Sequence, residues 1–138
     1  MGKIKKKNRS IAKNGIKINE FSHISTQQEH PIFCLKHLDK NYYSLRACTK
    51  DEKAAFADTL FKLSQLTWGE ITQSHRHGIG YEKIVKKSIR APIPAHITDD
   101  VTIIAFRFYG KAPMVGHREA AIFHILWIDR DFTLYYHG

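Results

Sequence analysis

Two histidines near the C-terminus are the first candidates for chemistry in this sequence. His124 interrupts the apolar run 122–128, and His137 ends a Tyr-Tyr-His triplet. A polar ring inside an apolar strand must find a buried hydrogen-bond partner or face a cleft. Imidazole exchanges protons near neutral pH, so two such rings in a cleft could act as general base and general acid. A core histidine with a satisfied ring remains the alternative for His124.

Three further side chains in the same region could hold charge or stack on a substrate. A guanidinium can bind two phosphate oxygens, which suits Arg118. Glu119 is an alternative base, although an exposed ion pair with its neighbour would be the ordinary explanation. Tyr135 could stack on a nucleobase. Two imidazoles and a guanidinium are what RNA cleavage by 2′-hydroxyl attack requires. We therefore predict a catalytic set of Arg118, His124, His137, Tyr135 and Glu119.

Four strands would have to position this set. Apolar runs separated by turn residues predict strands at 101–109, 114–118, 122–129 and 132–137. A three-residue loop at 119–121 would pair Gly116 with His124, and a two-residue loop at 130–131 would pair His124 with His137.

This register divides the strand residues between two faces of the sheet. One face would carry Gly116, Arg118, Ile122, His124, Leu126, Thr133, Tyr135 and His137. The other would carry Val115, His117, Phe123, Ile125, Trp127, Phe132, Leu134 and Tyr136. The second set is mostly apolar and should pack on helices, whereas a one-residue slip in either hairpin would move a histidine to the opposite face.

The helices are expected in the middle of the chain. Thr49 and Glu52 have the spacing of a capping box, and apolar residues then recur at helical intervals, which predicts a helix over 50–66. A shorter helix is expected at 68–74. Apolar runs at 32–35 and 42–45 suggest an initial hairpin. The predicted fold class is α+β, an antiparallel sheet with one or two helices packed on one face.

The composition fits one domain with a basic arm. The chain has 138 residues, of which 43% are hydrophobic, and a net charge of +9. Residues 1–20 contain seven basic side chains and one acidic one, and so carry +6 of that charge. We predict a basic arm at 1–30 and a single α+β domain at 31–138. The arm suggests a polyanionic partner, although a solvated tail would have the same composition.

Two basic segments are candidates for RNA binding. The first contains Lys83, Lys86, Lys87 and Arg90, which could extend a phosphate-binding track or simply form a solvated segment. The second is His75, Arg76 and His77. Two histidines two residues apart could share a metal ion, but zinc needs three or four ligands and no partner has a recognisable spacing. We therefore predict phosphate contacts there, with no metal site and no cofactor.

The sequence also predicts a cytoplasmic location without a membrane partner. It contains no run of eighteen apolar residues, and its basic start lacks the apolar stretch of a secretory signal. Cys34 and Cys48 are expected to be free thiols in a reducing compartment.

The C-terminal pattern resembles the RelE/YoeB-like toxin family of ribonucleases. The resemblance covers residues 49–137 and rests on a Gly-His-Arg-Glu segment at 116–119, an apolar strand, an acidic turn at 129–131 and the terminal Tyr-Tyr-His. It implies cleavage of messenger RNA, commonly on the ribosome, and inhibition by a small antitoxin protein. It also implies that Arg118 binds phosphate and that His137 is the general acid. The chain departs from the family pattern in ending at Gly138 and in its additional arm.

Three functions therefore compete. A metal-independent endoribonuclease of the toxin type is the leading hypothesis, with Glu82 as a further candidate base. In a non-catalytic nucleic-acid-binding protein of a phage or mobile element, the arm and the sheet face would bind phosphate and the histidines would be structural. A protein-binding module would instead use the aromatic C-terminal hairpin.

Overall fold

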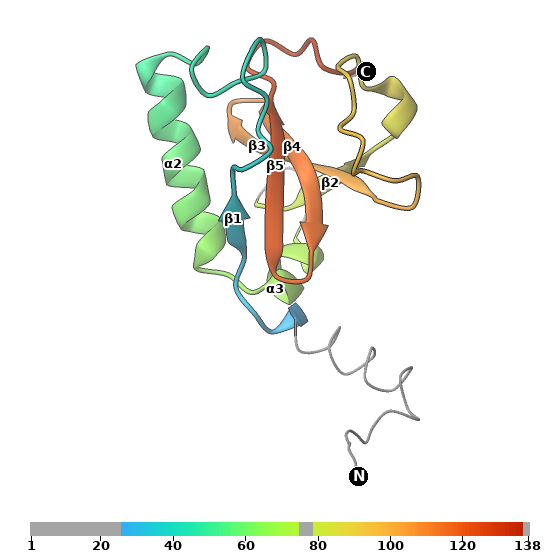
Figure 1. Cartoon of the computed structure of the whole chain (residues 1–138). Helices are drawn as coiled ribbons and strands as arrows, with labels where there is room; N and C mark the ends of the chain where they lie inside the picture. The colour runs from blue at the N-terminus through green and yellow to red at the C-terminus, as the bar shows by residue number, and fades with distance from the viewer. Residues whose placement is uncertain (1–25, 75–78, 137–138) are drawn as a thin grey trace.

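The computed structural model describes residues 26–74 and 79–136, which form a five-stranded mixed sheet with helices packed against it (Figure 1). The spatial order is β1 (Ile32–Cys34), β5 (Ile122–Ile128), β4 (Ala112–Glu119), β3 (Ile103–Tyr109) and β2 (Tyr81–Ile84). Strand β1 is parallel to β5, and the other neighbours are antiparallel. The predicted α+β class is confirmed.

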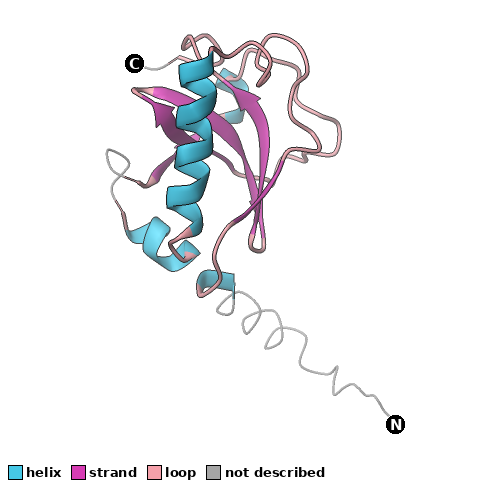
Figure 2. Cartoon of the chain, turned by 90° about the vertical axis from the view of Figure 1, so that its left-hand side faces the viewer, coloured by secondary structure: helices cyan, strands magenta, loops and turns pink. Residues whose placement is uncertain are grey.

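Two helices cover one face of the sheet, as predicted. They are α2 (Lys50–Ser64) and α3 (Trp68–Gln73), and Figure 2 shows α2 lying across the strands. Each helix begins with a complete capping box, formed by Thr49 with Glu52 and by Thr67 with Glu70. These reciprocal bonds satisfy amides that the first turn leaves without helical partners. The N-terminus of each helix is therefore determined by residues that lie close together in the sequence.

The sheet has an apolar core on each side. The helix side buries Phe56, Leu63, Trp68, Phe106, Phe123 and Ile125, among others. On the opposite side, Ile97, Val115, Leu126, Trp127 and Leu134 form a second core beneath the loop 85–101 and the C-terminal segment. The loop includes the short 3₁₀ helix η1 (Lys86–Ser88) and lies on the far side of the sheet from α2 (Figure 1). The face predicted to be open is therefore largely covered.

The predicted register of β4 and β5 is wrong by one residue. Glu119 pairs with Ile122, so the connection has two residues, and Ala120 adopts a positive φ of 55°. His117 rather than Gly116 consequently lies opposite His124. A β-bulge then occurs in β5, because Gly116 pairs with Ile125 while Val115 pairs with Trp127.

This register changes the predicted division between the two faces. Phe123 and Ile125 pack on the helix side, as expected. Val115, Trp127 and Leu134 instead belong to the opposite core. Arg118 lies opposite Phe123 on the helix side, where its guanidinium covers Trp68. The two-residue turn and the bulge are together responsible for these differences.

The predicted last strand is not formed within residues 132–136. A turn is found instead, held by the fully buried carboxylate of Asp129. That carboxylate accepts hydrogen bonds from the amides of Thr133 and Leu134, at 2.8 and 3.2 Å. These amides are therefore satisfied without a strand partner. His137 lies outside the described residues, so its predicted pairing with His124 is not observed.

The predicted first hairpin is also wrong. Strand β1 pairs with β5, and residues 42–45 form turns rather than a strand. The beginning of the described chain is attached to the helices, since Glu29 O accepts from the amide of Trp68 at 2.9 Å and His30 Nδ1 lies 2.9 Å from Ser64 O. The domain therefore begins before residue 31. The rest of the predicted arm, residues 1–25, lies outside the described residues.

Candidate functional site

A pocket forms where the β4–β5 hairpin extends beyond β3. The β3–β4 ladder ends at the Ile104–Gly116 pair, whereas β4 continues to pair with β5 as far as Glu119. Side chains from both faces of β4 can therefore reach the same space around its outer edge. The resulting pocket has a volume of about 590 Å³ and is lined by Tyr81, Lys83, His96, Asp100, Val101, Thr102, Ile104, His117, Arg118 and Glu119.

Four histidines form a row beside this pocket. The ring centroids of His37 and His96 are 4.3 Å apart, and those of His96 and His117 are 6.5 Å apart. The rings of His117 and His124 are stacked, with centroids 4.8 Å apart and an interplanar angle of 17°. Only His96 and His117 line the pocket itself. The row therefore places two imidazoles in the pocket wall and a third directly behind one of them.

Glu119 fixes the orientation of the ring behind the wall. Its Oε1 lies 2.9 Å from His124 Nε2, at hydrogen-bonding distance. A carboxylate that accepts a ring N–H sets both the tautomer and the angle of an imidazole. His124 in turn supports the ring of His117 by stacking. Glu119 and His124 therefore act together as a support for His117.

His117 is suited to accept a proton. Burial is the main factor that lowers the pKa of His117, and the neighbouring His124 lowers it further, so the ring is neutral at neutral pH. Within the described part of the chain, His117 Nε2 and His124 Nδ1 are buried without a hydrogen-bond partner. Unpaired buried polar atoms are rare in folded proteins and are often found at functional sites. Two such atoms in neighbouring rings beside a pocket mark this place as a candidate functional site.

Two cations border the same pocket. Lys83 is exposed on β2, and Arg118 is half-buried on β4. The Arg118 guanidinium lies 4.3 Å from the centre of the Trp68 ring, and its Nε donates to Ala120 O at 2.7 Å. Burial lowers the pKa of Arg118, but a guanidinium stays charged at neutral pH and has four further N–H donors. Arg118 is thus a fixed cation, and Lys83 is a flexible one.

The structure places only some residues of the predicted catalytic set at the pocket. Arg118 and Glu119 line the pocket, and His124 lies directly behind it. Tyr135 is buried and lines a different pocket, where burial and then the charge of Glu82 raise its pKa. The prediction that Tyr135 shares a site with Arg118 is therefore wrong. His137 lies beyond the described residues.

The predicted RNA-binding residues are also distributed unevenly. Lys83 lines the pocket, whereas Lys86 donates from Nζ to Thr98 O at 2.5 Å. Lys87 and Arg90 are exposed near η1 and do not line it. His75, Arg76 and His77 fall in the undescribed gap. Only one lysine of the predicted track is thus observed at the pocket.

Sequence reasoning missed the two histidines that line the pocket. A three-residue loop between β4 and β5 predicts His117 on the helix-packing face, but the loop has two residues. Counting two residues would have placed His117 beside His124 from the sequence alone. His96 follows Pro94 and Ala95 in an irregular connection. No periodic pattern there could have indicated its position.

No family model, curated protein or solved structure matches this chain. In residues 26–74 and 79–136, no group of three or more histidine, cysteine, aspartate or glutamate side chains is arranged to hold a metal ion. The same residues contain no helix that is long and apolar enough to cross a membrane. The assignment of function therefore rests on the geometry of the pocket.

Proposed function

We propose that the protein is an endoribonuclease that cleaves RNA by attack of the 2′-hydroxyl on the adjacent phosphate. The observation that carries the proposal is the pair His96 and His117, whose ring centroids are 6.5 Å apart in one pocket with Lys83 and Arg118. This reaction needs a base for the 2′-hydroxyl, an acid for the leaving 5′-oxygen and cations for the phosphate. All these groups line the same pocket.

The position of the rings supports His96 and His117 as the reacting pair. Both line the pocket, whereas His124 is stacked against His117 and does not line it. His96 is exposed, so its ring can contact a bound substrate. Because burial lowers the pKa of His117, its ring is neutral at neutral pH and takes the role of general base. His96 then protonates the leaving oxygen, and Glu119 and His124 are positioning residues.

The cations would act on the phosphate. Arg118 is held by Trp68 and Ala120, so its charge is already oriented when the substrate binds. Preorganised donors stabilise developing charge without further reorganisation. Lys83 would neutralise a neighbouring phosphate. The high net charge of +9 would also draw RNA toward the pocket.

Cleavage of RNA tests the proposal directly. Wild-type protein should produce fragments with 2′,3′-cyclic or 3′-phosphate ends in the presence of EDTA, assayed on free RNA and on translating ribosomes. His117→Ala and His96→Ala should each reduce the rate by roughly 10²–10⁴-fold, as expected for loss of a general base or acid. Arg118→Ala should reduce it by roughly 10²–10³-fold, as expected for loss of a preorganised charge partner.

Matched variants distinguish the pocket from general effects. His30→Ala and Lys87→Ala remove a histidine and a lysine that do not line the pocket, and both should cleave like wild type. All pocket variants should still bind RNA. Equal rates for His117→Ala and His30→Ala would refute the site. Binding without cleavage on either substrate would favour a non-catalytic nucleic-acid-binding protein.

The resemblance to the RelE/YoeB-like toxins supplies the proposed biological setting. In that setting the protein is a cytoplasmic toxin that cleaves messenger RNA and is inhibited by a small antitoxin protein. Expression from a tightly regulated promoter should arrest growth, and His117→Ala should relieve the arrest. If a small acidic protein is encoded beside the gene, its co-expression should relieve the arrest as well.

A further inference from the structure

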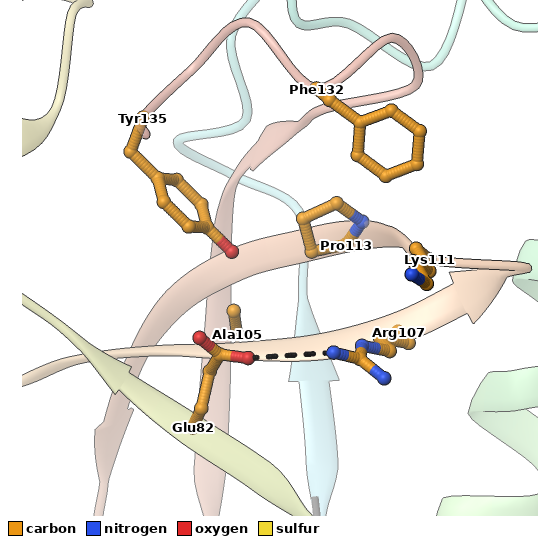
Figure 3. Close-up of a pocket in the computed structure, with 7 residues that line it drawn as sticks. All are labelled: Glu82, Ala105, Arg107, Lys111, Pro113, Phe132 and Tyr135. Atoms are coloured by element: carbon orange, nitrogen blue, oxygen red, sulfur yellow. Dashed lines mark ion pairs between the residues drawn. The ribbon is translucent and has the colours of Figure 1, made fainter. Parts of the chain in front are cut away.

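A second pocket lies on the sheet face opposite the helices. It has a volume of about 270 Å³ and is lined by Glu82, Ala105, Arg107, Lys111, Pro113, Phe132 and Tyr135. These residues come from β2, β3, the β3–β4 turn, β4 and the segment after β5, so distant parts of the chain build one cavity (Figure 3). The volume falls just below the usual range of about 300–1,000 Å³ for ligand pockets. It is suited to one small, flat molecule.

An aromatic ring is held at the pocket by an unfavourable backbone conformation. Phe132 has a φ of 63°, in the left-handed region that bulky residues rarely adopt. The hydrogen bonds from Thr133 and Leu134 to buried Asp129 stabilise the turn around it. Phe132 nevertheless remains 43% exposed. Strain that is retained to hold an exposed ring is characteristic of ligand sites.

The polar lining combines an acceptor with donors. Arg107 Nη2 lies 3.9 Å from Glu82 Oε1, and both side chains are about one-third exposed. Figure 3 shows the Tyr135 hydroxyl directed toward Glu82, with Tyr135 and Phe132 on either side of Pro113. Both side chains are partly exposed, so a ligand in the pocket can contact the carboxylate and the guanidinium. Lys111 adds a cation at the rim.

We infer that this pocket binds one guanine base of an RNA chain. Guanine has two adjacent N–H donors on its Watson–Crick edge, which the two oxygens of Glu82 can accept together. Its O6 and N7 are acceptors, and arginine recognises them with paired donors. The exposed Phe132 ring provides a stacking surface, and Lys111 can contact the attached phosphate. The inference rests on the proposed RNA substrate. It makes this pocket the site that determines which base of the RNA is bound.

Binding of mononucleotides tests the inference independently of cleavage. Calorimetric titration with 5′-GMP, 5′-AMP, 5′-CMP and 5′-UMP should show GMP binding at least about tenfold more tightly than the others. Glu82→Gln removes one of the paired acceptors and should weaken GMP binding by roughly 5- to 150-fold. Equal affinities for the four nucleotides, or no binding of GMP, would overturn the inference.

Phe132→Asn separates a binding role from a structural one. Asparagine tolerates positive φ, so this variant should melt at the same or a higher temperature while losing roughly 5- to 150-fold in GMP affinity. Tyr136→Ala removes an exposed aromatic residue that does not line the pocket and should leave GMP binding unchanged. A lower melting temperature with unchanged GMP affinity would make Phe132 structural and contradict the inference.

The two proposals can fail separately. His96→Ala lies outside this pocket and should bind GMP like the wild type. GMP binding without RNA cleavage by the wild type would leave the guanine pocket standing and refute the nuclease. RNA cleavage by a wild type that does not prefer GMP would support the nuclease and refute the guanine pocket.

Discussion

Protonation of His117 links the candidate site to the free energy of unfolding. Its pKa in the folded protein is lowered from 6.5, because burial disfavours the charged ring and His124 lies against it. Well above pH 6.5 the ring is neutral in both the folded and unfolded states. As the pH falls below that value, the unfolded state takes up the proton more readily, so the free energy of unfolding decreases.

We therefore expect acid to destabilise the protein partly through His117. Urea denaturation of the wild type should show a lower free energy of unfolding at pH 5 than at pH 7. His117→Asn should reduce this difference, since asparagine does not titrate. His30→Asn is the control, because His30 is exposed and does not line the pocket. An identical pH dependence in His117→Asn and the wild type would mean that burial of His117 does not affect its protonation.

Among the structural elements, the bulged β4–β5 pair depends most on a single residue. A Cβ atom built on Gly116 would lie 1.9 Å from the backbone oxygen of His124. Backbone atoms of a paired strand cannot move aside as a flexible side chain can. The same bulge puts both Leu126 and Trp127 in the core opposite the helices. Gly116 therefore permits the close strand approach that defines the register of the site.

Gly116→Ala should consequently be among the most damaging single substitutions in the sheet. We expect a loss of about 3 kcal/mol in the free energy of unfolding, at the upper end of overpacking effects, measured by urea denaturation. Gly110→Ala is a matched control, because Gly110 has a φ of 59° but no atom within 4 Å of a built Cβ. It should cost only about 1 kcal/mol from backbone strain. Similar losses in the two variants would contradict the close approach.

Across the whole molecule, the charge is concentrated at the N-terminus. Residues 1–20 hold +6 of the net +9. A deletion and a charge-neutralised variant can distinguish the effect of this charge from any effect on the fold. Basic residues that contact phosphates release counterions, so their contribution to RNA binding decreases as salt increases.

Deletion of residues 2–20 should weaken RNA binding at low salt and reduce the salt dependence of the affinity, with little change in melting temperature. Fluorescence anisotropy with labelled RNA over a range of salt concentrations would measure both effects. A full-length variant with its seven basic residues replaced by glutamine should behave like the deletion. A large loss of melting temperature in the deletion, but not in the glutamine variant, would show that the segment is part of the fold.

The sequence alone determined the features that depend on neighbouring residues. Thr49 and Glu52 are three residues apart, so their reciprocal bonds fix the start of α2 without help from the rest of the chain. The apolar spacing that follows and the strands near 103–109 and 122–128 are likewise local patterns. The α+β class follows from the order of these elements.

Only the tertiary structure decided how the elements form a site. A turn of two residues instead of three moved His117 to the face of His124, because side chains alternate along a strand. The short β3–β4 ladder then opened one pocket to both faces of β4. His96 reached this pocket from an irregular loop that no local pattern could place. The register of a sheet and the path of a loop depend on packing between distant residues, and that packing brought the histidines together.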